Sequence, residues 1–433
     1  MNMSSWISSR DEWLREGERN DGLSPLRESG DIPVYFRGAY AGTLSHDDRG
    51  VFRFAPSEAG RASTLGCLPG LSGESDRLFG VFKSLLSERR RYDRLISLVG
   101  RADPLCLLTS IRDHPALSFD DALANEVPER FPEVPFGDVV AGTLSIPEDV
   151  LRSVASRRAR DVSLFSGTQD KIVVVAGPDV IRLPEEGERG NAILKTAPSW
   201  SRHASLPAFV ANEHLFCSLA ARIGLDCAKN VLVDTGMPDI GDGLLSRRFD
   251  VAGDEPQLFV EAPVICGTGL GSDSEKYDFR AEELVTTIPE EDTASRGSLA
   301  EGLFFSMCIG NTDMHLRNFS FVVSGSPACG MKLRPAPLYD VSNLAVYNLP
   351  YFALLFDTDE GARRLAVQEP EDVETLCAFV RRYVSAERML DLLARIDDAL
   401  PAMLPVSRID ASLASKILSD VTERTATARR WLE

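Results

Sequence analysis

The polar middle of IGNTDMHLRNFSF, residues 309–321, separates two segments of different character. The residues before it, 303–309, are apolar at helical spacing and stop at Gly310, and glycine commonly ends helices. The residues after it, 319–323, are aromatic and β-branched, which predicts a strand. The loop between the predicted helix and strand holds an acid, Asp313, and an amide, Asn318.

A second acid, Asp340, follows Leu338 and Tyr339 in another predicted short strand. A loop aspartate, an asparagine five residues later and an aspartate at the end of a later strand form the polar set of kinase-type phosphoryl transfer. In that chemistry we expect Asp313 to orient the attacking hydroxyl. We expect Asn318 and Asp340 to hold magnesium, which prefers hard oxygen ligands.

Each of these residues also has a simpler interpretation. A single loop Asp or Asn is most often a turn residue or a helix cap. A single loop histidine such as His315 more often braces its loop than contacts a phosphate. The joint spacing favours phosphoryl transfer, but two alternatives stay open. One is a metal hydrolase using Asp313, His315 and Asp340, although no second histidine lies at ligand spacing. The other is a protein that binds a nucleotide without turning it over.

The composition is that of a globular protein long enough, at 433 residues, for two or three domains. A net charge of -18 argues against a broad nucleic-acid surface, because phosphate binding needs clustered Lys and Arg. The eight cysteines are scattered without zinc spacing, which predicts reduced thiols in a cytoplasmic protein. The first residues lack a signal-peptide pattern and no uncharged apolar run reaches membrane length, so we expect no membrane span.

The chain is predicted to begin with a flexible extension, residues 1–31, followed by a small α+β subdomain over 32–125. That subdomain has a hairpin and a third strand near its start. Three helices are expected after them, at 78–86, 92–99 and 104–111. Residues 126–150, which are rich in proline, are predicted to be a connector.

The remaining residues, 151–433, are predicted to form a core with an N-lobe over about 151–250 and a C-lobe over about 251–433. A Gly-containing loop precedes the strand 172–175, and Lys195 ends the next strand. The backbone of such a loop can bind phosphates, and a strand lysine can neutralise them. Glu213, on a predicted helix, is a candidate partner for Lys195.

The glycine-rich segment 266–272 has G-x-G-x-G spacing, but no βαβ frame surrounds it, so we reject a dinucleotide site there. We expect a flexible loop near the substrate instead. Amphipathic patterns at 371–384, 386–400 and 412–432 predict an α-rich C-lobe.

From Ile32 onward the chain resembles the HipA-type toxin kinases, the toxin half of type II toxin–antitoxin pairs. The most specific match is the stretch 310–320, joined by LYDV at 338–341. The loop SGTQDK at 166–171 is similar to the family's phosphate-gripping loop, and AILK at 192–195 to the strand with its ATP lysine.

The resemblance implies an α+β, protein-kinase-like two-lobed fold with an added N-terminal α+β subdomain and an α-rich C-lobe. It implies a serine/threonine-protein kinase that uses ATP and Mg2+ and acts on a protein substrate such as an aminoacyl-tRNA synthetase. It also implies a HipB-like helix-turn-helix antitoxin, through which the acidic chain would reach DNA indirectly.

The expected ATP site combines the loop, the strand lysine, the hinge and the polar residues described above. Its members are Ser166, Gly167, Thr168, Gln169, Asp170, Lys171, Lys195, Arg248, Phe249, His315, Arg317, Asn318, Tyr339 and Asp340. The catalytic residue is Asp313, and the metal ligands are Asn318 and Asp340.

The chain departs from the family at a few positions. Leu164 stands where a regulatory serine is common, so we expect autophosphorylation at Ser163 or Ser166. Arg247 stands where the hinge is often acidic, and residues 113–116 replace a Gly-rich turn.

Overall fold

The computed structural model describes residues 30–86, 103–109, 111, 114–119, 146–147, 150, 171–177, 181–185, 188, 190–196, 208–235, 241–251, 257–268 and 275–433. Several predictions therefore lie outside the described residues. They are the extension up to residue 29, the helix at 92–99, most of the connector 126–150, residues 269–272 of the glycine-rich segment, and the loop residues Ser163, Ser166, Gly167, Thr168, Gln169 and Asp170.

Contacts divide the chain into two compact units. Unit 1 comprises Met1–Ser199, Val231–Leu258 and Ser324–Met331, and unit 2 comprises Trp200–Asn230, Phe259–Val323 and Lys332–Glu433. The predicted domain boundaries differ from this division and stay predictions, and the one at 125/126 falls where no residue is described.

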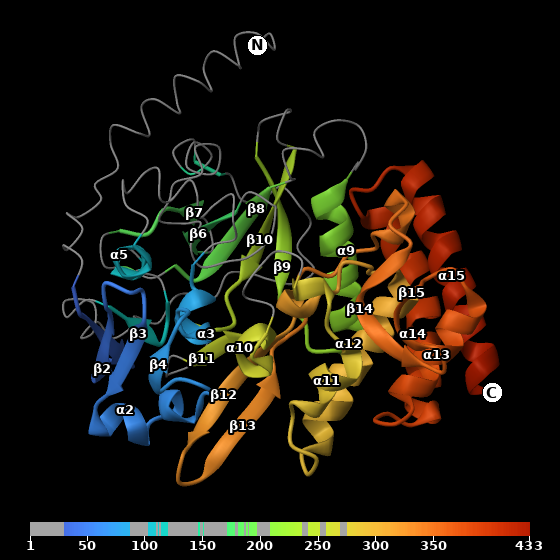
Figure 1. Ribbon diagram of the computed structural model, residues 1–433. Helices are drawn as coiled ribbons and strands as arrows, with labels where there is room; N and C mark the ends of the chain where they lie inside the picture. Colours follow the sequence, from blue (N-terminus) through green and yellow to red (C-terminus); the bar gives the residue numbers. More distant parts are fainter. Residues whose placement is uncertain are drawn as a thin grey trace. The chain divides into compact units, whose positions relative to one another are not determined.

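The N-terminal part of unit 1 is an antiparallel sheet with strand order β4-β3-β2-β1-β5 (Figure 1). Its strands are β1 (Ile32–Phe36), β2 (Ala39–His46), β3 (Phe52–Pro56), β4 (Gly73–Ser75) and β5 (Leu117–Ser118). The predicted hairpin is present as β1 and β2, because alternate β1 residues are buried as a half-buried strand requires. Short helices accompany the sheet: α2 (Glu58–Ala62), η1 (Thr64–Cys67), α3 (Gly80–Lys83) and α5 (Pro104–Thr109).

The helix predicted over 78–86 is wrong in length, because α3 covers only four of those residues. The apolar side chains that suggested a long helix pack on the sheet instead. Phe54 lies edge-on to Phe79 and Phe82, with ring centroids 6.5 and 5.6 Å away. Tertiary packing overrides local helical spacing here, and Gly80 at the helix start adds little helix propensity.

A second sheet in unit 1 has strand order β7-β6-β8-β10-β9. Its strands are β6 (Lys171–Ala176), β7 (Ile181–Arg182), β8 (Ala192–Thr196), β9 (Asn230–Asp234) and β10 (Asp242–Arg247). One core cluster fills a face of this sheet, with Ile172, Leu194 and Leu245 fully buried at its centre. The predicted strand 172–175 and the predicted strand that ends at Lys195 are present as β6 and β8.

Unit 2 is built on long helices that pack side by side (Figure 1). They are α9 (Phe209–Arg222), α12 (Thr293–Ile309), α13 (Pro370–Val380), α14 (Ala386–Met403) and α15 (Ala411–Leu432). The three C-terminal helices confirm the amphipathic patterns in the sequence, since each buries one side of its surface. Shorter helical segments are α10 (Ala262–Cys266), η2 (Glu275–Tyr277), α11 (Ala281–Thr286), η3 (Leu316–Asn318), η4 (Ala345–Tyr347) and η5 (Leu404–Val406).

Two further sheets complete the fold. One has the order β11-β12-β13, with β11 (Leu258–Glu261), β12 (Ser320–Ser326) and β13 (Gly330–Pro335). The other is the hairpin of β14 (Tyr351–Thr358) and β15 (Gly361–Ala366), whose second strand was not predicted.

The short strand predicted just before Asp340 is wrong. Leu338 forms only an isolated bridge to Cys227, because Asp340 has a left-handed backbone with φ of 53° and ends the extended run. Among the described helices, none is long and apolar enough to cross a membrane.

Candidate active site

The loop of residues 310–318, called here the Asp313 loop, begins where α12 ends. Gly310 has a φ of 74°, and its N–H donates to the carbonyl of Met307, which terminates the helix in the left-handed geometry that glycine tolerates. The Asn318 side chain then donates from Nδ2 to the backbone carbonyl of Asp313 at 2.6 Å. This bond joins the two predicted polar residues across the loop and leaves the Asp313 side chain exposed.

The segment that carries the second acid, residues 338–345, is called here the Asp340 loop. Both ends of the Asp340 loop are bonded to the Asp313 loop. At its start, the Tyr339 hydroxyl donates to the carbonyl of Arg317 at 3.2 Å. At its end, the N–H groups of Leu344 and Ala345 donate to the carbonyl of Gly310 at 3.0 and 3.1 Å. The segments carrying Asp313, Asn318 and Asp340 therefore run together within unit 2.

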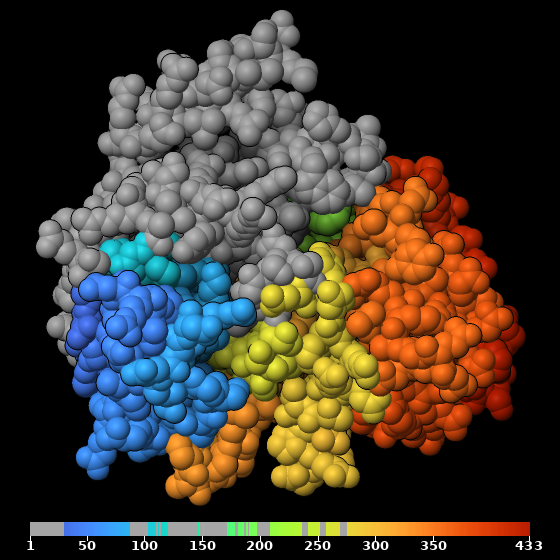
Figure 2. Space-filling model, viewed as in Figure 1, coloured from blue at the N-terminus to red at the C-terminus, as the bar shows by residue number. Residues whose placement is uncertain are grey.

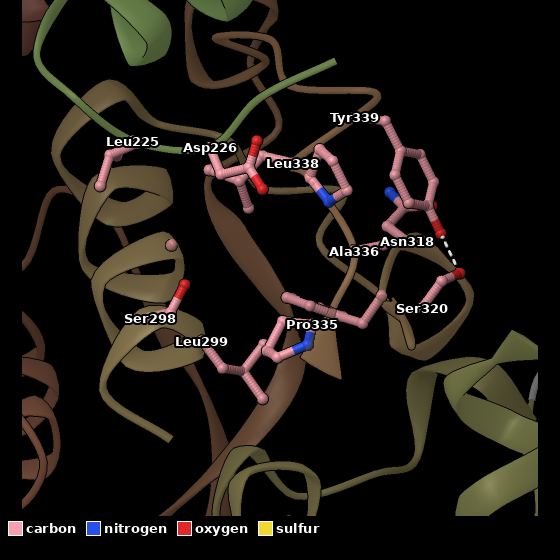
Figure 3. A pocket seen from close by; sticks show the side chains of 13 residues that line it. Leu225, Asp226, Ser298, Leu299, Asn318, Ser320, Pro335, Ala336, Leu338 and Tyr339 are labelled. Atoms are coloured by element: carbon pink, nitrogen blue, oxygen red, sulfur yellow. Dashed lines mark hydrogen bonds between the residues drawn. The ribbon is translucent and has the colours of Figure 1, made fainter. Parts of the chain in front are cut away.

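Tyr339 also bonds the strand that follows the Asp313 loop, because its hydroxyl lies 2.7 Å from Ser320 Oγ (Figure 3). Burial, and then the charge of Glu261, raises the pKa of the Tyr339 hydroxyl above its usual value. The hydroxyl therefore keeps its proton. It donates that proton to the carbonyl of Arg317 while the hydroxyl of Ser320 donates to Tyr339.

Asp340 is one of four non-glycine residues with positive φ among those described. A left-handed backbone costs about 1–2 kcal/mol for a residue with a Cβ, although Asp tolerates it better than most. Such conformations occur at functional sites, where neighbouring contacts hold them in place. The bonds at both ends of the Asp340 loop supply such contacts.

A small cavity of about 30 Å³ lies behind Asn318 and Tyr339 and is lined also by Asp226, Ser320 and Leu338 (Figure 3). Its volume suits about one water molecule. A nucleotide does not fit there, so the cavity is not the expected ATP site. Leu338 forms two backbone hydrogen bonds of 2.8 Å with the neighbouring segment 226–228. Its N–H donates to the carbonyl of Asp226, and its carbonyl accepts from the N–H of Ala228.

Buried polar groups that the sequence did not reveal hold the Asp340 loop from the other side. The Asn343 side chain donates from Nδ2 to Asp420 Oδ2 at 2.8 Å, and Asp420 also accepts from the guanidinium of Arg424. Arg424 Nε donates to the carbonyl of Cys308 near the end of α12, at 3.2 Å. One signal was available: Arg424 occupies a helical position in line with Leu413, Ile417, Val421 and Ala428, which are all buried.

Two residues of the Asp313 loop predicted to contact ATP have structural contacts here. The His315 ring is buried edge-on to Tyr277, with ring centroids 5.3 Å apart. The Arg317 guanidinium donates from Nε to Glu261 Oε2 at 2.9 Å and is largely buried. His315 therefore packs within the fold, as expected of a histidine that braces its loop. A role in nucleotide binding stays a prediction for both residues.

In unit 1, two lysines of the expected ATP site face each other. Lys171 in β6 pairs directly with Lys195 in β8, and both side chains are buried. This arrangement suits the binding of an anion such as a polyphosphate.

The hinge residues of the expected ATP site lie at the end of β10. The Arg248 guanidinium is buried and grips Asp250 with bonds of 2.8 and 3.1 Å, and it also donates to the carbonyl of Gly190. Burial raises the pKa of the Asp250 carboxyl, but the positive charge of Arg248 outweighs burial and the pKa lies below its usual value. Phe249, which lies between Arg248 and Asp250 in the sequence, is half-buried. The pairing of Lys195 with Glu213 would join unit 1 to unit 2 and stays a prediction.

The donor set of the two loops fits magnesium. Because the Asn318 Nδ2 donates to a carbonyl, its Oδ1 is the acceptor that remains for a ligand, and Asp340 adds a carboxylate. Within the described ranges, the side-chain oxygens of Asn311 and Thr312, beside Asp313, are buried without a hydrogen-bond partner. Such unsatisfied groups are uncommon and often mark places where water or an ion belongs.

Among the residues that the structure describes, no group of three or more His, Cys, Asp and Glu side chains gathers as a metal site. The metal-hydrolase alternative built on Asp313, His315 and Asp340 therefore gains no support. A magnesium site with one carboxylate and one amide does not require such a group, because Mg2+ keeps several of its waters.

Comparison with known proteins identifies the family of the chain. A family model described as the HipA-like C-terminal domain matches residues 163–404, which is more than half of the chain. The chain therefore belongs to this family, as the resemblance in its sequence predicted.

Two curated relatives are named as putative kinases. The "Putative kinase" of Haemophilus influenzae is 26% identical over 220 residues, which cover 47% of this chain and 60% of the relative. The "Putative kinase Y4dM" of Sinorhizobium fredii is 23% identical over 268 residues, which cover 58% of this chain and 61% of the relative. The matched part thus spans about 60% of the length of these relatives.

A solved structure of the HipA, HipB and operator DNA complex from Shewanella oneidensis contains a chain with a similar fold. The TM-score is 0.65 at 17% identity, and the match covers 93% of this chain and 97% of the other. At this identity the likeness concerns the fold. The predicted α+β, HipA-like fold is confirmed.

Proposed function

We propose that the chain is an ATP- and Mg2+-dependent serine/threonine-protein kinase and the toxin of a type II toxin–antitoxin pair. The observation that carries this proposal is the bonding of the Asp340 loop to the Asp313 loop at both ends. This bonding supports a single site in which Asp313 orients the hydroxyl and Asn318 and Asp340 supply two oxygen ligands for the metal. Membership of the HipA-like family and the relatives named as putative kinases support the same activity.

In the proposed reaction, a substrate hydroxyl oxygen attacks the γ-phosphorus of ATP. A bond forms between these atoms while the bond from the γ-phosphorus to the β–γ bridging oxygen breaks, and ADP leaves with the electron pair. The Asp313 carboxylate orients the hydroxyl and accepts its proton. Asn318 Oδ1 and the Asp340 carboxylate would hold Mg2+, which neutralises charge on the phosphates when bound.

Phosphate binding is assigned to Lys171 and Lys195. Their direct pairing across β6 and β8 concentrates two positive charges on one face of a sheet. Because ATP would bind the folded chain and not the unfolded one, its binding is expected to raise the stability of the fold. The loop residues Ser166, Gly167, Thr168, Gln169 and Asp170 and the hinge residues Arg248 and Phe249 complete the proposed nucleotide site.

The proposed substrate is a protein hydroxyl, with a translation factor such as an aminoacyl-tRNA synthetase as the first class to test. The proposed partner is a HipB-like helix-turn-helix antitoxin, as in the Shewanella complex of HipA, HipB and DNA. A chain with a net charge of -18 is expected to reach DNA only through such a partner.

The test is ATP turnover and transfer of labelled γ-phosphate to protein by the wild type and by Asp313→Asn, with magnesium varied. Asp313→Asn keeps the side-chain shape but cannot accept the proton, and loss of a positioned base is expected to cost about 10²–10⁴-fold in rate. Asp340→Asn is expected to raise the magnesium concentration needed for half-maximal rate.

The matched control is Asp398→Asn, an exposed aspartate on α14, which is expected to behave as the wild type. A wild type that binds ATP but neither hydrolyses nor transfers it would contradict the kinase and favour a nucleotide-binding regulator that acts through the antitoxin. Equal rates for Asp313→Asn and Asp398→Asn would remove Asp313 from the mechanism.

A further inference from the structure

A groove of about 340 Å³ lies beside Asp313 in unit 2. Thr312 and Asp313 form one part of its wall and Tyr277 and Asp278 another, and Leu349 with the β14–β15 hairpin forms the rest. In Figure 2 the part of the chain to which this hairpin belongs, coloured orange, lies at the surface. If Asp313 orients the attacking hydroxyl, then whatever occupies this groove lies next to the residue that carries that hydroxyl.

The hairpin wall is fixed to the Asp313 loop by backbone bonds. The N–H of Ala353 donates to the carbonyl of Thr312 at 3.0 Å. Between Tyr351 and Leu355 the strand β14 takes four steps while its partner β15, from Ala366 to Arg364, takes two. Within this bulge Ala353 bonds the Asp313 loop, and bulges commonly re-aim side chains beside active sites. The groove is therefore held in place relative to Asp313.

The rim of the groove is apolar and exposed. Leu349 is 48% exposed and Tyr351 is 61% exposed, although both are large. Among the described residues five large apolar side chains are more than 40% exposed, and two of them line this one groove. Exposed apolar side chains that gather in one concave place mark binding sites, whereas single ones are ordinary.

The charges in the groove exclude an acidic occupant. Its charged residues are Asp278, Asp313 and Arg364. Arg364 Nη2 already donates to the carbonyl of Tyr277 at 2.9 Å and to Asp278 Oδ1 at 3.1 Å. The one basic group is thus engaged by acceptors of the protein itself. The sum of these three charges is negative, so a neutral or basic segment suits the groove better than an acidic one.

We propose that this groove binds the phosphoacceptor segment of the protein substrate and selects an apolar residue next to the acceptor serine or threonine. The apolar side chain packs between Leu349 and Tyr351, while the acceptor hydroxyl faces Asp313. This inference rests on the proposed kinase activity and adds the sequence class of the substrate to it.

The test is a library of peptides with a central serine or threonine, in which each flanking position is fixed in turn as Leu, Phe, Lys or Asp. Transfer of γ-phosphate from labelled ATP is measured for the full-length wild type, Tyr351→Ser and Leu349→Ser. The wild type is expected to prefer Leu or Phe over Asp at one flanking position by about tenfold or more, the value of burying one large apolar side chain.

Tyr351→Ser and Leu349→Ser are each expected to reduce that preference by at least about threefold. The KM for the preferred peptide should rise while the KM for ATP stays constant. The matched control is Val406→Ser, which changes an apolar side chain that is 83% exposed but does not line the groove. It should keep the wild-type preference.

Three results overturn the inference: no labelled peptide from an enzyme that turns over ATP, a preference that survives both substitutions, or an equal loss in Val406→Ser. A rise in the KM for ATP instead would assign the groove to the nucleotide. Failure of the wild type to turn over ATP at all would contradict the proposed kinase itself, and this outcome is distinct from the other results.

Discussion

The Asn212 side chain forms two hydrogen bonds with the backbone of Asn343. Its Oδ1 accepts from the N–H of Asn343 and its Nδ2 donates to the carbonyl of Asn343, both at 2.9 Å. Both residues are fully buried, and the bonds join α9 to the Asp340 loop within unit 2. One amide side chain thus satisfies both backbone groups of a residue three positions after the predicted metal ligand.

We expect Asn212→Ala to lower the free energy of unfolding by about 1–3 kcal/mol, because both backbone groups of Asn343 would lose their partners in a buried place. The Asp340 loop would also be less well held, so the magnesium dependence of ATP turnover should shift to higher concentration. Thermal unfolding and a magnesium titration measure the two effects. Glu387→Ala, an exposed change on α14, is the control and should alter neither.

A second prediction concerns Gly310, which has a φ of 74° at the end of α12. A Cβ added there would lie 2.6 Å from Arg424 Nη2 and 2.9 Å from the Cβ of Ala345. Gly330 has a similar φ of 79°, but an added Cβ meets nothing within 4 Å. Both alanine variants carry the cost of a left-handed backbone. The difference between their losses of stability therefore measures the crowding at Gly310 alone.

We expect Gly310→Ala to be less stable than Gly330→Ala by about 1–3 kcal/mol, the usual cost of overpacking. Chemical denaturation of both variants measures this difference. Equal losses would show that Arg424 and Ala345 move aside without cost.

The buried ion pair between Arg317 and Glu261 should matter more than an exposed one. Their side chains are 9% and 14% exposed, and removing one partner of such a pair costs about 3–5 kcal/mol. The exposed pair of Arg280 and Asp357, at 3.2 Å, is the matched control and should contribute less than about 1 kcal/mol. Chemical denaturation of Glu261→Gln and Asp357→Asn measures the loss of stability at each pair, and similar losses would contradict this expectation.

The depressed pKa of Asp250 predicts a stability change in acid. A carboxyl whose pKa is lower in the folded protein stabilises the fold fully above its unfolded pKa of about 3.8. That contribution is lost as the pH falls through the lower folded value. Urea unfolding between pH 3 and 7 should therefore show a wild type that is more stable than Asp250→Asn near neutrality. The two midpoints should approach each other at the acid end, and a constant gap would exclude Asp250 as the titrating group.

Autophosphorylation is the remaining prediction, and it comes from sequence, because Ser163 and Ser166 lie outside the described residues. A phosphate on either serine would repel the phosphates of ATP and lower nucleotide affinity. Mass spectrometry after incubation with ATP should find one of them modified, and Ser163→Ala with Ser166→Ala should abolish the signal. An active kinase with both serines unmodified would contradict the prediction.

The polar residues of the Asp313 loop and Asp340 could be found from sequence because their spacing follows from chemistry. The groups that hold them could not. Asn343 and Asp420 are 77 positions apart, and nothing in either local sequence indicates their hydrogen bond. Only Arg424, a charged residue in an apolar helical row, signalled a buried polar contact.

Local spacing also misjudged two elements. The apolar residues 78–86 have helical spacing, yet only four of them form α3, because contacts with Phe54 decide their placement. The hairpin strand β15 was missed, because its exposed end carries Ala362, Arg363 and Arg364, which have no strand pattern. Pairing with β14, and not propensity, defines it.

The bulge in β14 sets a rule for how the length of this hairpin can vary. Side chains alternate between the two faces of a strand, so losing or gaining one residue between Tyr351 and Leu355 would turn Tyr351 to the opposite face. A change of two residues would leave the Tyr351 side chain on the same face of the strand but would change its distance from Asp313. Insertions and deletions of odd length at this point should therefore be rare in proteins that share the groove, even where the individual amino acids differ.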